Sequence, residues 1–362
     1  MKNILILSSI TLLVAAYQCA GQGPLTPPGP PGSTMHTLEE IYQRLEANQD
    51  AIEANQATLE ANQEAIEARL EAIEQQGASE VPEGMVLIPA GDFVMGDTFG
   101  EGSSDELPVH TVTVSAFYMG ETEVTKTQWD AVHGWAVTNG YAFENAGLGK
   151  AGNHPVHTVN WNDCVKWANA RSEMEGLSPC YLAETTTGTV YRAGALAPTV
   201  DRYASGYRLP TEAEWEKAAR GGAPGTRFPW TGVNTIQHTR ANYEADTGSD
   251  AYDTSAQDGY HPDYDDDPEP YTSPVGTFAP NGYGLYDMGG NVWEWCEDVY
   301  VDSYQGTPTD GSAQTSGGSG RVLRGGCWYN SAWFVRSTNR SRDHPSHSYH
   351  YLGFRVCLGR SR

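Results

Sequence analysis

The stretch GYRLPTEAEWEKAARGG at residues 206–222 shows most directly how this chain folds locally. Thr211 stands three positions before Glu214, which is the spacing of a capping box at a helix N-terminus. Gly221 and Gly222 follow the apolar and charged residues and end the helix, because glycine favours the backbone conformation of a helix C-terminus. The stretch therefore predicts one short helix bounded by loops.

Similar signals lie outward from this stretch. Thr125 and Gln128 make a second capping pair, and residues 160–175 have the pattern of a helix that is stopped by a glycine. Residues 85–96 and 109–120 look like paired strands with turn glycines. The rest is mainly loop, so residues 78–362 are predicted to form one α+β head with few helices.

Composition excludes several classes of protein. The 362 residues contain 46 Asp and Glu against 22 Lys and Arg, a formal net charge of −24. A general nucleic-acid-binding protein needs basic surfaces that displace counterions, so no nucleic-acid partner is expected. No apolar run reaches the roughly 18 residues of a membrane span, which excludes a polytopic membrane protein.

Residues 1–19 have the organisation of an export signal. Lys2 precedes an apolar stretch at residues 4–16, and Cys19 follows with small residues behind it. Cys19 would carry the lipid of a bacterial lipoprotein, which predicts a membrane anchor and a place at the cell surface or outer membrane. The alternative is ordinary export of a secreted protein without lipid. Residues 20–36 form a Pro/Gly linker.

Residues 37–77 carry a heptad repeat and predict an α-helical coiled-coil stalk. One apolar residue per heptad would leave a lone helix weak, so association is required. Asparagine at d positions resembles the stalks of trimeric surface adhesins, and we expect a parallel homotrimer. A dimer and a single solvated helix are the alternatives. The a positions are Leu38, Leu45, Ile52, Leu59, Ile66 and Ile73, and the d asparagines are Asn48, Asn55 and Asn62.

Several segments of the head together resemble the formylglycine-generating enzyme (sulfatase-modifying factor) family. They are IPAGDFVMG, ETEVTKTQW, HPVHTVNWNDC, GYRLPTEAEWEKAARGG, APNGYGLYDMGGNVWEWCED, RVLRGG and LGFRV, and they span residues 81–358. The resemblance implies a variant of the C-type-lectin-like fold, with two helices, a small twisted sheet and long loops.

The resemblance also implies structural calcium. One Ca²⁺ would be bound by Asn291, Glu294 and the carbonyl of Val292. A second would be bound by the side chains of Asn242 and Asp267 and the carbonyls of Tyr243 and Glu269, beside the acidic run at residues 263–269. The alternative for that run is a solvated acidic face.

The oxidase activity of the family needs two cysteines after the RGG motif, which bind substrate and hold copper as thiolates. Asn330 and Val335 occupy those positions here. Neither supplies a thiolate, which Cu(I) prefers, so the comparison implies no enzyme activity and no copper. Six cysteines less Cys19 leave five, so at least one lacks an intramolecular disulfide partner.

The segment that replaces the active site resembles the variable region of diversity-generating retroelement proteins. Residues 329–351 contain no Lys, Glu, Gln, Met or Gly and are dominated by residues that adenine-directed mutagenesis of Asn codons produces. Trp328, Arg336, Asn339, Arg340 and Pro345 look like fixed scaffold. The expected ligand-binding residues are Tyr329, Asn330, Ser331, Trp333, Phe334, Ser341, Asp343, His344, Ser346, His347, Ser348, Tyr349, His350 and Tyr351.

The resulting hypothesis is a surface-displayed receptor that binds a protein or glycan of another cell or host through a variable segment at about residues 327–351. The alternatives are an oxidase or other metalloenzyme, or a non-catalytic structural module of the envelope. His344, His347 and His350 could instead bind a metal, and Tyr349 or Tyr351 could be a half-buried strand residue. The segment could also be a drifted, inactive enzyme loop.

Overall fold

The computed structural model describes residues 81–183 and 188–359, and a few residues of the predicted stalk. The chain divides into two compact units, residues 1–79 and 80–362. The export signal, Cys19, the linker and most of the stalk lie outside the described residues, so the coiled coil and its trimer stay predictions. The described stalk residues are helical and exposed: Gln43, Asn48, Gln49, Ile52, Asn55, Gln56 and Gln63.

The first sheet joins the two ends of the head. Its strand order is β1-β4-β12-β7, and Leu358 in β12 lies opposite Tyr118 in β4 and Tyr207 in β7. A separate hairpin pairs β2 with β3, so the prediction that residues 85–96 pair with residues 109–120 is confirmed. The strands are β1 (Met85–Ile88), β2 (Gly91–Met95), β3 (His110–Val114), β4 (Phe117–Gly120), β7 (Tyr207–Arg208) and β12 (Cys357–Gly359).

The second sheet frames the predicted variable segment. Its order is β10-β9-β8-β11, and every residue of the central strand β8 is buried. The chain leaves β9, runs through residues 325–340, returns as β10 and continues through residues 344–351 to β11. The strands are β8 (Trp293–Val299), β9 (Arg321–Arg324), β10 (Ser341–Asp343) and β11 (Leu352–Gly353), and a small pair is formed by β5 (Tyr181–Leu182) and β6 (Thr199–Val200).

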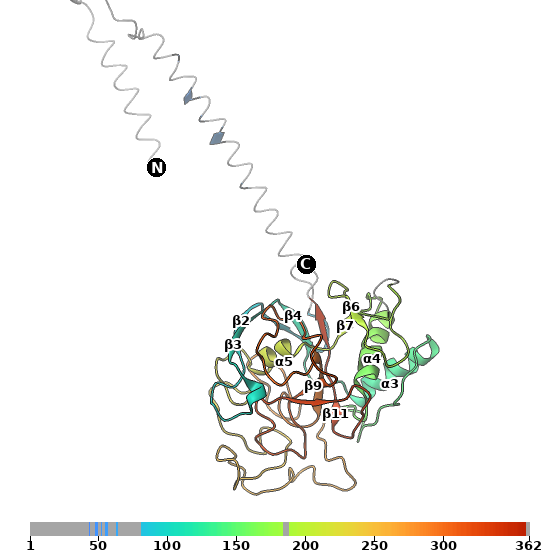
Figure 1. Cartoon of the computed structure of the whole chain (residues 1–362), viewed down its shortest axis with the longest axis vertical. Helices are drawn as coiled ribbons and strands as arrows, with labels where there is room; N and C mark the ends of the chain where they lie inside the picture. Colours follow the sequence, from blue (N-terminus) through green and yellow to red (C-terminus); the bar gives the residue numbers. More distant parts are fainter. Residues whose placement is uncertain are drawn as a thin grey trace, which may run out of the picture. The chain divides into compact units, whose positions relative to one another are not determined.

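The helices begin where the sequence predicts. The Thr125 and Thr211 side chains accept hydrogen bonds from the backbone N–H groups of Gln128 and Glu214, and Asn160 caps its helix through Asp163. The helices α3 and α4 pack against each other on one side of the head, away from β2 and β3 (Figure 1). The helices are η1 (Ser104–Glu106), α3 (Lys126–Thr138), α4 (Trp161–Met174) and α5 (Glu212–Ala219).

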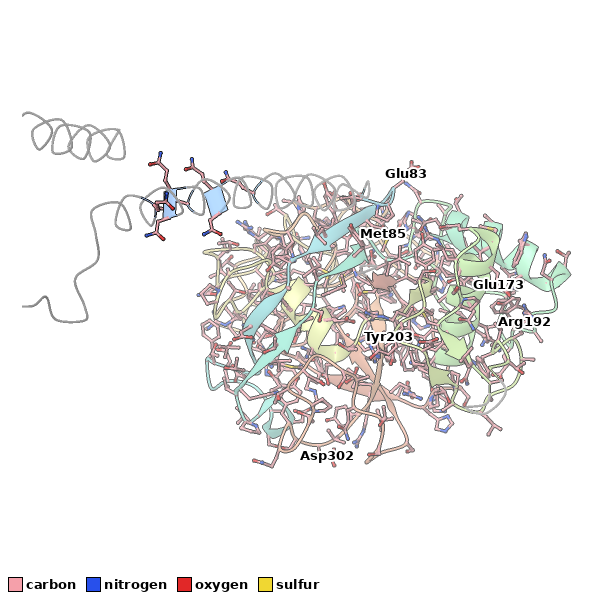
Figure 2. All side chains as sticks on the ribbon, turned by 90° about the horizontal axis from the view of Figure 1, so that it is seen from above. Glu83, Met85, Glu173, Arg192, Tyr203 and Asp302 are labelled. Carbon is pink, nitrogen blue, oxygen red and sulfur yellow. The ribbon has the colours of Figure 1, made fainter. Side chains whose placement is uncertain are left out.

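The core is built from tryptophans. Trp129 of α3 stacks on Trp167 of α4 with ring centroids 6.2 Å apart, and Trp215 of α5 and Trp295 of β8 are fully buried. Surface pairs such as Glu173 and Arg192 close the loop beside α4 (Figure 2). In the described part of the chain, none of the helices has the length and apolar character needed to span a bilayer. The α+β fold with few helices agrees with the prediction.

Candidate functional site

The variable segment, residues 327–351, separates into buried anchors and accessible side chains. Trp328, Arg336, Asn339 and Arg340, expected as scaffold, are all buried, and Pro345 is half-buried. Each expected ligand-binding residue keeps part of its surface in solvent, and Phe334 and Tyr349 are exposed by 37% and 39%. The expected ligand-binding residues are therefore all at least partly accessible, and four of the five expected scaffold residues are buried.

Two buried ion pairs fix the middle of the variable segment. Both terminal nitrogens of Arg336 donate to the carboxylate of Glu106 at 2.9 and 2.7 Å. Arg340 donates to Glu212, the first residue of α5, through Nε at 2.6 Å and Nη2 at 2.8 Å. Bidentate Arg–carboxylate pairs hold a fixed geometry. They make residues 336–340 a rigid base for the residues on either side.

The second half of the segment is held against the region around α4. The Asn162 side chain donates to the carbonyl of Pro345 at 3.2 Å, and the Ser348 hydroxyl donates to the side-chain carbonyl of Asn145 at 3.0 Å. The backbone N–H of Thr158, a residue with a positive φ of 57°, donates to the carbonyl of Tyr349 at 2.9 Å. These contacts position residues 344–351 without using their aromatic rings.

The rings left free gather into one aromatic face, defined here as Tyr329, Tyr349, His350 and Tyr351. Tyr349 stacks on Tyr351 at 5.2 Å, and Tyr329 meets Tyr351 edge-on at 5.0 Å. His350 lies 5.7 Å from the buried ring of Trp328. Tyr351 is half-buried, but it lies in the turn before β11 and is not a strand residue, so the alternative for these tyrosines is met only in its burial. Rigid rings in contact offer binding area at low entropic cost.

Trp333 and Phe334 form a second aromatic group. Their rings meet edge-on at 4.9 Å, and Phe334 also contacts Trp293 of β8 at 6.5 Å. Arg336 lies over the Trp333 ring at 4.8 Å, and the backbone N–H of Trp333 donates to Asp250. These contacts hold both rings in place, while part of each side chain stays accessible to solvent.

The three histidines of the segment do not converge on one point: the His344 and His347 rings lie 5.4 Å apart, but His350 packs elsewhere. His347 Nδ1 lies 2.6 Å from Asp343 and His344 Nδ1 lies 2.7 Å from Ser346, whereas the His350 ring packs on Trp328. Across residues 81–183 and 188–359, no three His, Cys, Asp or Glu side chains are placed to hold a metal ion. The metal alternative for the three histidines finds no support in this arrangement.

The described cysteines are all free thiols in buried positions: Cys164, Cys180, Cys296, Cys327 and Cys357. Burial raises the pKa of each thiol above its usual range. The Cys327 thiol donates to the side-chain oxygen of Asn330 at 3.0 Å. A nucleophilic or copper-binding cysteine has to be a thiolate, and burial in apolar surroundings opposes that form.

One predicted calcium site contains an unpartnered ligand atom. The side-chain oxygen of Asn242 is buried and accepts no hydrogen bond, although its Nδ2 donates to the carbonyl of Tyr271 at 2.7 Å. The Tyr271 hydroxyl in turn donates to Asp267 at 2.9 Å, so Tyr271 links the two predicted ligands. An orphaned buried carbonyl oxygen fits a hard cation, and the exposed Asp267 carboxylate lies at the hydroxyl end of the tyrosine whose backbone carbonyl Asn242 contacts.

The other predicted calcium site is differently organised. Glu294 receives Arg355 through two hydrogen bonds, at 2.7 and 2.6 Å, and Trp215 Nε1 at 2.6 Å. Asn291 accepts from the backbone N–H of Ser273 at 3.0 Å. Both side chains are therefore already engaged, and in this arrangement they do not fit a cation as the resemblance implied.

Two buried carboxylates near Glu294 were not anticipated from the sequence. Burial and the charge of Asp287 raise the pKa of Glu123, and burial raises the pKa of Asp287 to about 6. Arg355 is the guanidinium that faces Glu123, Asp287 and Glu294 together. Withdrawal from water is the main reason that both pKa values rise, and neighbouring carboxylates add to it. The ETEVT stretch at residues 121–125 contains no pattern that predicts a buried carboxylate with a raised pKa at Glu123.

A further group beside the variable segment also escaped sequence reasoning. The backbone N–H of Glu244 donates to the carbonyl of Asn330 at 3.0 Å, and Ala245 pairs with Gly259, which places Glu244 next to Tyr260. Tyr260 and Tyr271 lie 5.5 and 5.1 Å from the Trp328 ring. The one sequence feature that drew attention to the region of Tyr260 and Tyr271 was the acidic run at residues 263–269.

Comparisons with known proteins agree with this fold. The family described as "Sulfatase-modifying factor enzyme 1-like domain" matches residues 70–359. The chain belongs to this family. Its relatives include the formylglycine-generating enzyme of Streptomyces coelicolor, 34% identical over 302 residues that cover 75% of this chain and 88% of the relative. The chaperone protein LppX of Paenibacillus barcinonensis is 33% identical and covers 70% of this chain and 82% of the relative.

Solved structures that resemble this chain include Treponema denticola variable protein 1. It superimposes with a TM-score of 0.59 at 32% identity, covering 76% of this chain and 95% of the other. PvdO from Pseudomonas aeruginosa gives a TM-score of 0.56 at 30% identity, with coverage of 76% and 94%. The present family member thus resembles both proteins named as enzymes and a protein named as variable, and the site residues have to distinguish between these functions.

Proposed function

We propose that this chain is a ligand-binding receptor whose variable segment contacts a protein or glycan partner. The observation that carries the proposal is that the expected ligand-binding residues are accessible on both sides of a buried centre at residues 335–340. All expected ligand-binding side chains are at least partly accessible, while residues 335–340 are buried and Arg336 and Arg340 form ion pairs there. A rigid base with exchangeable Tyr, His, Ser and Asn side chains is the organisation that antibody loops use for recognition.

The oxidase alternative finds less support. Asn330 and Val335 stand where the family's catalytic thiols are expected, and Val335 is fully buried in an apolar cluster with Ala332 and Phe228. Cys327 is buried, and its pKa is raised by that burial. A copper site of two thiolates therefore lacks its donors at this place.

The experiment selects peptides that bind the whole chain from a displayed random library and then compares two tyrosine variants. Tyr349→Ala removes a ring of the aromatic face. Tyr203→Ala removes a ring that is 93% exposed but lies outside the variable segment. Interface tyrosines that act as hot spots contribute about 2 kcal/mol or more, so the first variant should weaken binding by about 30-fold and the second should leave it unchanged.

Equal binding by wild type and Tyr349→Ala would contradict the receptor proposal, provided that the far-ultraviolet circular dichroism of the variant is unchanged. Oxygen consumption with a cysteine-containing peptide and added copper tests the oxidase alternative directly. Turnover in that assay would overturn the receptor proposal in favour of an enzyme.

Calcium is proposed as a structural ion at the Asn242–Asp267 site. Asn242 and Asp267 would hold it through side-chain oxygens, with the carbonyls of Tyr243 and Glu269. The unpartnered Asn242 oxygen supports this assignment. Bound there, the ion would connect the acidic run at residues 263–269 to residues 242–243. This place is close to Tyr271, whose ring contacts Trp328.

The mode of display is proposed from the sequence. A lipid on Cys19, the linker and a trimeric stalk would present three heads from the cell surface. Linked copies raise the effective concentration of the second and third contacts, so weak individual contacts give strong overall binding.

A further inference from the structure

A cleft outside the variable segment lies at the end of the first sheet where β4 and β7 begin and β12 ends. Its volume is about 470 Å³, and pockets that bind small molecules typically measure roughly 300–1,000 Å³. Among the described residues it is lined by residues 114–117, 202–205, 208, 214, 310–312 and 359, none of which belongs to the variable segment. The cleft is thus large enough for a small ligand.

Tyr203 stands on the wall of this cleft with its ring free. The side chain is 93% exposed, the highest value for a large hydrophobic residue in the described part of the chain (Figure 2). The loop that carries the ring is held in place at two points. The backbone N–H of Tyr203 donates to the Asp201 carboxylate at 2.9 Å. The backbone N–H of Ser178 donates to the Ser205 hydroxyl at 3.1 Å. A fixed loop therefore presents an accessible aromatic ring.

Asp310 lies on a second wall, which is fixed against β3. The backbone N–H of Thr113 in β3 donates to the carbonyl of Thr309 at 2.9 Å. Gly311 has a positive φ of 77°, and a Cβ atom there would lie 3.2 Å from the carbonyl oxygen of Thr113, so the close approach favours glycine. The exposed Asp310 carboxylate accepts from the backbone N–H of Ser312 at 3.1 Å and from its hydroxyl at 2.6 Å. These contacts hold the carboxylate in one position.

Each guanidinium that lines the cleft already has a carboxylate partner. Arg208 donates to both oxygens of Glu214, at 2.6 and 2.7 Å. Arg202 pairs with the buried Glu297. Within the described ranges no ion pair joins Arg202 to Asp310, although both line the cleft. An anionic ligand would therefore find no uncompensated cation here, whereas the remaining N–H groups of Arg202 can donate to a neutral ligand.

A neutral saccharide matches an aromatic ring, a donor and an acceptor in one cleft. Its hydroxyl groups both donate and accept, so neighbouring hydroxyls can accept from Arg202 and donate to Asp310. The C–H groups on one face of a sugar ring form an apolar surface that packs on the ring of Tyr203. A zwitterion such as a dipeptide also has a donor and an acceptor, but its carboxylate would compete with Glu297 for the Arg202 guanidinium.

We propose that this cleft is a saccharide-binding site, in which Tyr203 packs on the sugar ring while Arg202 and Asp310 hydrogen-bond its hydroxyls. The site is separate from the variable segment and goes beyond the proposed receptor function. The head would then have two binding surfaces. One has side chains of the variable type, and the other would hold a glycan through fixed residues of the first sheet and its loops.

The experiment applies the full chain to an array of neutral oligosaccharides of glucose, galactose, mannose and N-acetylglucosamine. The sugar that binds best is then titrated in solution by saturation-transfer NMR, which also identifies the sugar protons that touch the protein. Tyr203→Ala should weaken binding about tenfold, and Tyr203→Phe should retain it, because the aromatic ring is kept. The exposure of Tyr203 means that neither variant disturbs the core.

A pair of aspartate variants tests the polar half of the cleft. Asp310→Asn should weaken binding several-fold, because a hydrogen bond to a charged acceptor is replaced by one to a neutral acceptor. The matched control is Asp302→Asn, which neutralises a carboxylate that is 84% exposed and does not line the cleft. It should bind the sugar as wild type does.

Failure of every sugar on the array to bind, or equal binding by wild type and Tyr203→Ala, would overturn the proposal. Displacement of the bound sugar by alanyl-alanine, which is a zwitterion, would also overturn it.

Tyr349→Ala separates the saccharide cleft from the receptor function. A sugar that loses affinity for Tyr349→Ala but binds Tyr203→Ala as well as wild type would lie at the variable segment. That result would uphold the receptor function and contradict the cleft. A sugar that depends on Tyr203 and not on Tyr349 would support the cleft, whatever the library-selected peptides show for the receptor function.

Discussion

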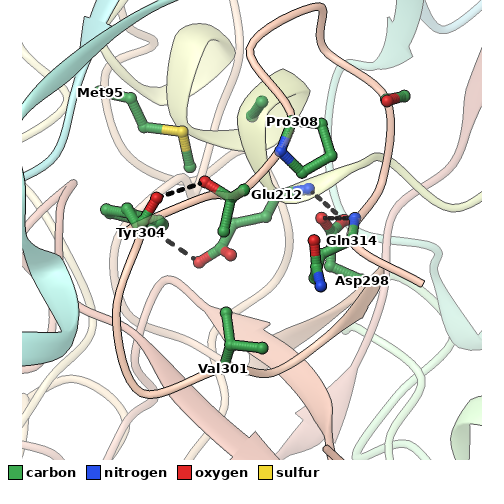
Figure 3. A pocket seen from close by; sticks show the side chains of 10 residues that line it. Met95, Glu212, Asp298, Val301, Tyr304, Pro308 and Gln314 are labelled. Carbon is green, nitrogen blue, oxygen red and sulfur yellow. Dashed lines mark hydrogen bonds between the residues drawn. The ribbon is translucent and has the colours of Figure 1, made fainter. Parts of the chain in front are cut away.

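Asp298 shows how one buried side chain is coupled to the base of the variable segment. It accepts the backbone N–H groups of Glu212 and Gln314 at 2.7 and 2.8 Å, on the wall of a small pocket that also contains Tyr304 (Figure 3). Burial and then the charge of Glu212 raise its pKa to about 7. Glu212 is also the partner of Arg340. An ionised Asp298 therefore repels the carboxylate on which this ion pair depends.

Asp298→Asn should make the stability of the head less dependent on pH. Because the pKa of Asp298 is about 7 in the folded state and 3.8 without that environment, its favourable contribution is complete below pH 4 and is lost as pH rises through 7. One pKa unit corresponds to about 1.4 kcal/mol, so the variant should gain a few kcal/mol on wild type between pH 5 and pH 8. Urea unfolding at both pH values measures this.

Asp302→Asn is the control for that experiment. Asp302 is also a carboxylate, but its side chain is 84% exposed and pairs with Arg342 on the surface. Its pH profile should follow that of wild type. Parallel profiles for wild type and Asp298→Asn would show that Asp298 does not titrate in the folded state as argued.

Calcium removal gives a second prediction at the level of single residues. A chelator should lower the melting temperature of wild type, because a bound ion stabilises only the folded state. Asp267→Asn should abolish the difference, since it removes the charged ligand. Glu269→Gln should keep it, because only the carbonyl of Glu269 is assigned to the ion. An identical response of all three proteins to the chelator would refute calcium at this site.

At the scale of elements, the sequence predicted what depends on local physics. Capping boxes at Thr125 and Thr211 placed two helix starts, because those hydrogen bonds join residues three apart. The strands at residues 85–96 and 109–120 were also found. Short strands such as β10 and β11 were not predicted. They are defined by pairing with β9 and β8 in the second sheet and not by a residue pattern of their own.

Asn162→Ala should loosen the loop between β10 and β11 while leaving the head folded. The variant removes the hydrogen bond to Pro345 but leaves the α4 cap at Asn160 in place. The loss should cost about 1 kcal/mol of stability. Backbone amides of residues 344–351 should exchange hydrogen faster, and library-selected peptides should bind several-fold more weakly because more entropy is lost on binding.

Ser303→Ala is a suitable comparison, since it removes a side-chain hydrogen bond to the carbonyl of Leu107 in an exposed turn outside the variable segment. It should leave both exchange and binding unchanged. Equal exchange of residues 344–351 in wild type and Asn162→Ala would mean that α4 does not position this loop.

At the scale of the whole molecule, sequence reasoning found one half of the candidate site. The variable segment was identified because its composition is unusual in one continuous stretch. Glu244 and Tyr260 were missed because a carboxylate or a tyrosine has no distinguishing pattern of its own, and only the pairing of Ala245 with Gly259 brings them to Asn330. Tertiary contacts between distant segments are what the sequence pattern did not contain.

The predicted trimer determines how strongly this whole molecule can bind. A chain comprising residues 37–362 should show three times its monomer mass by light scattering, whereas residues 80–362 should be monomeric, because the heptads at residues 37–77 supply the association. On a surface coated with a selected peptide, the longer chain should dissociate at least about a hundredfold more slowly, through simultaneous contacts of its heads. A monomer mass for residues 37–362 would remove the stalk's role, and equal dissociation by a confirmed trimer would mean that its heads cannot engage together.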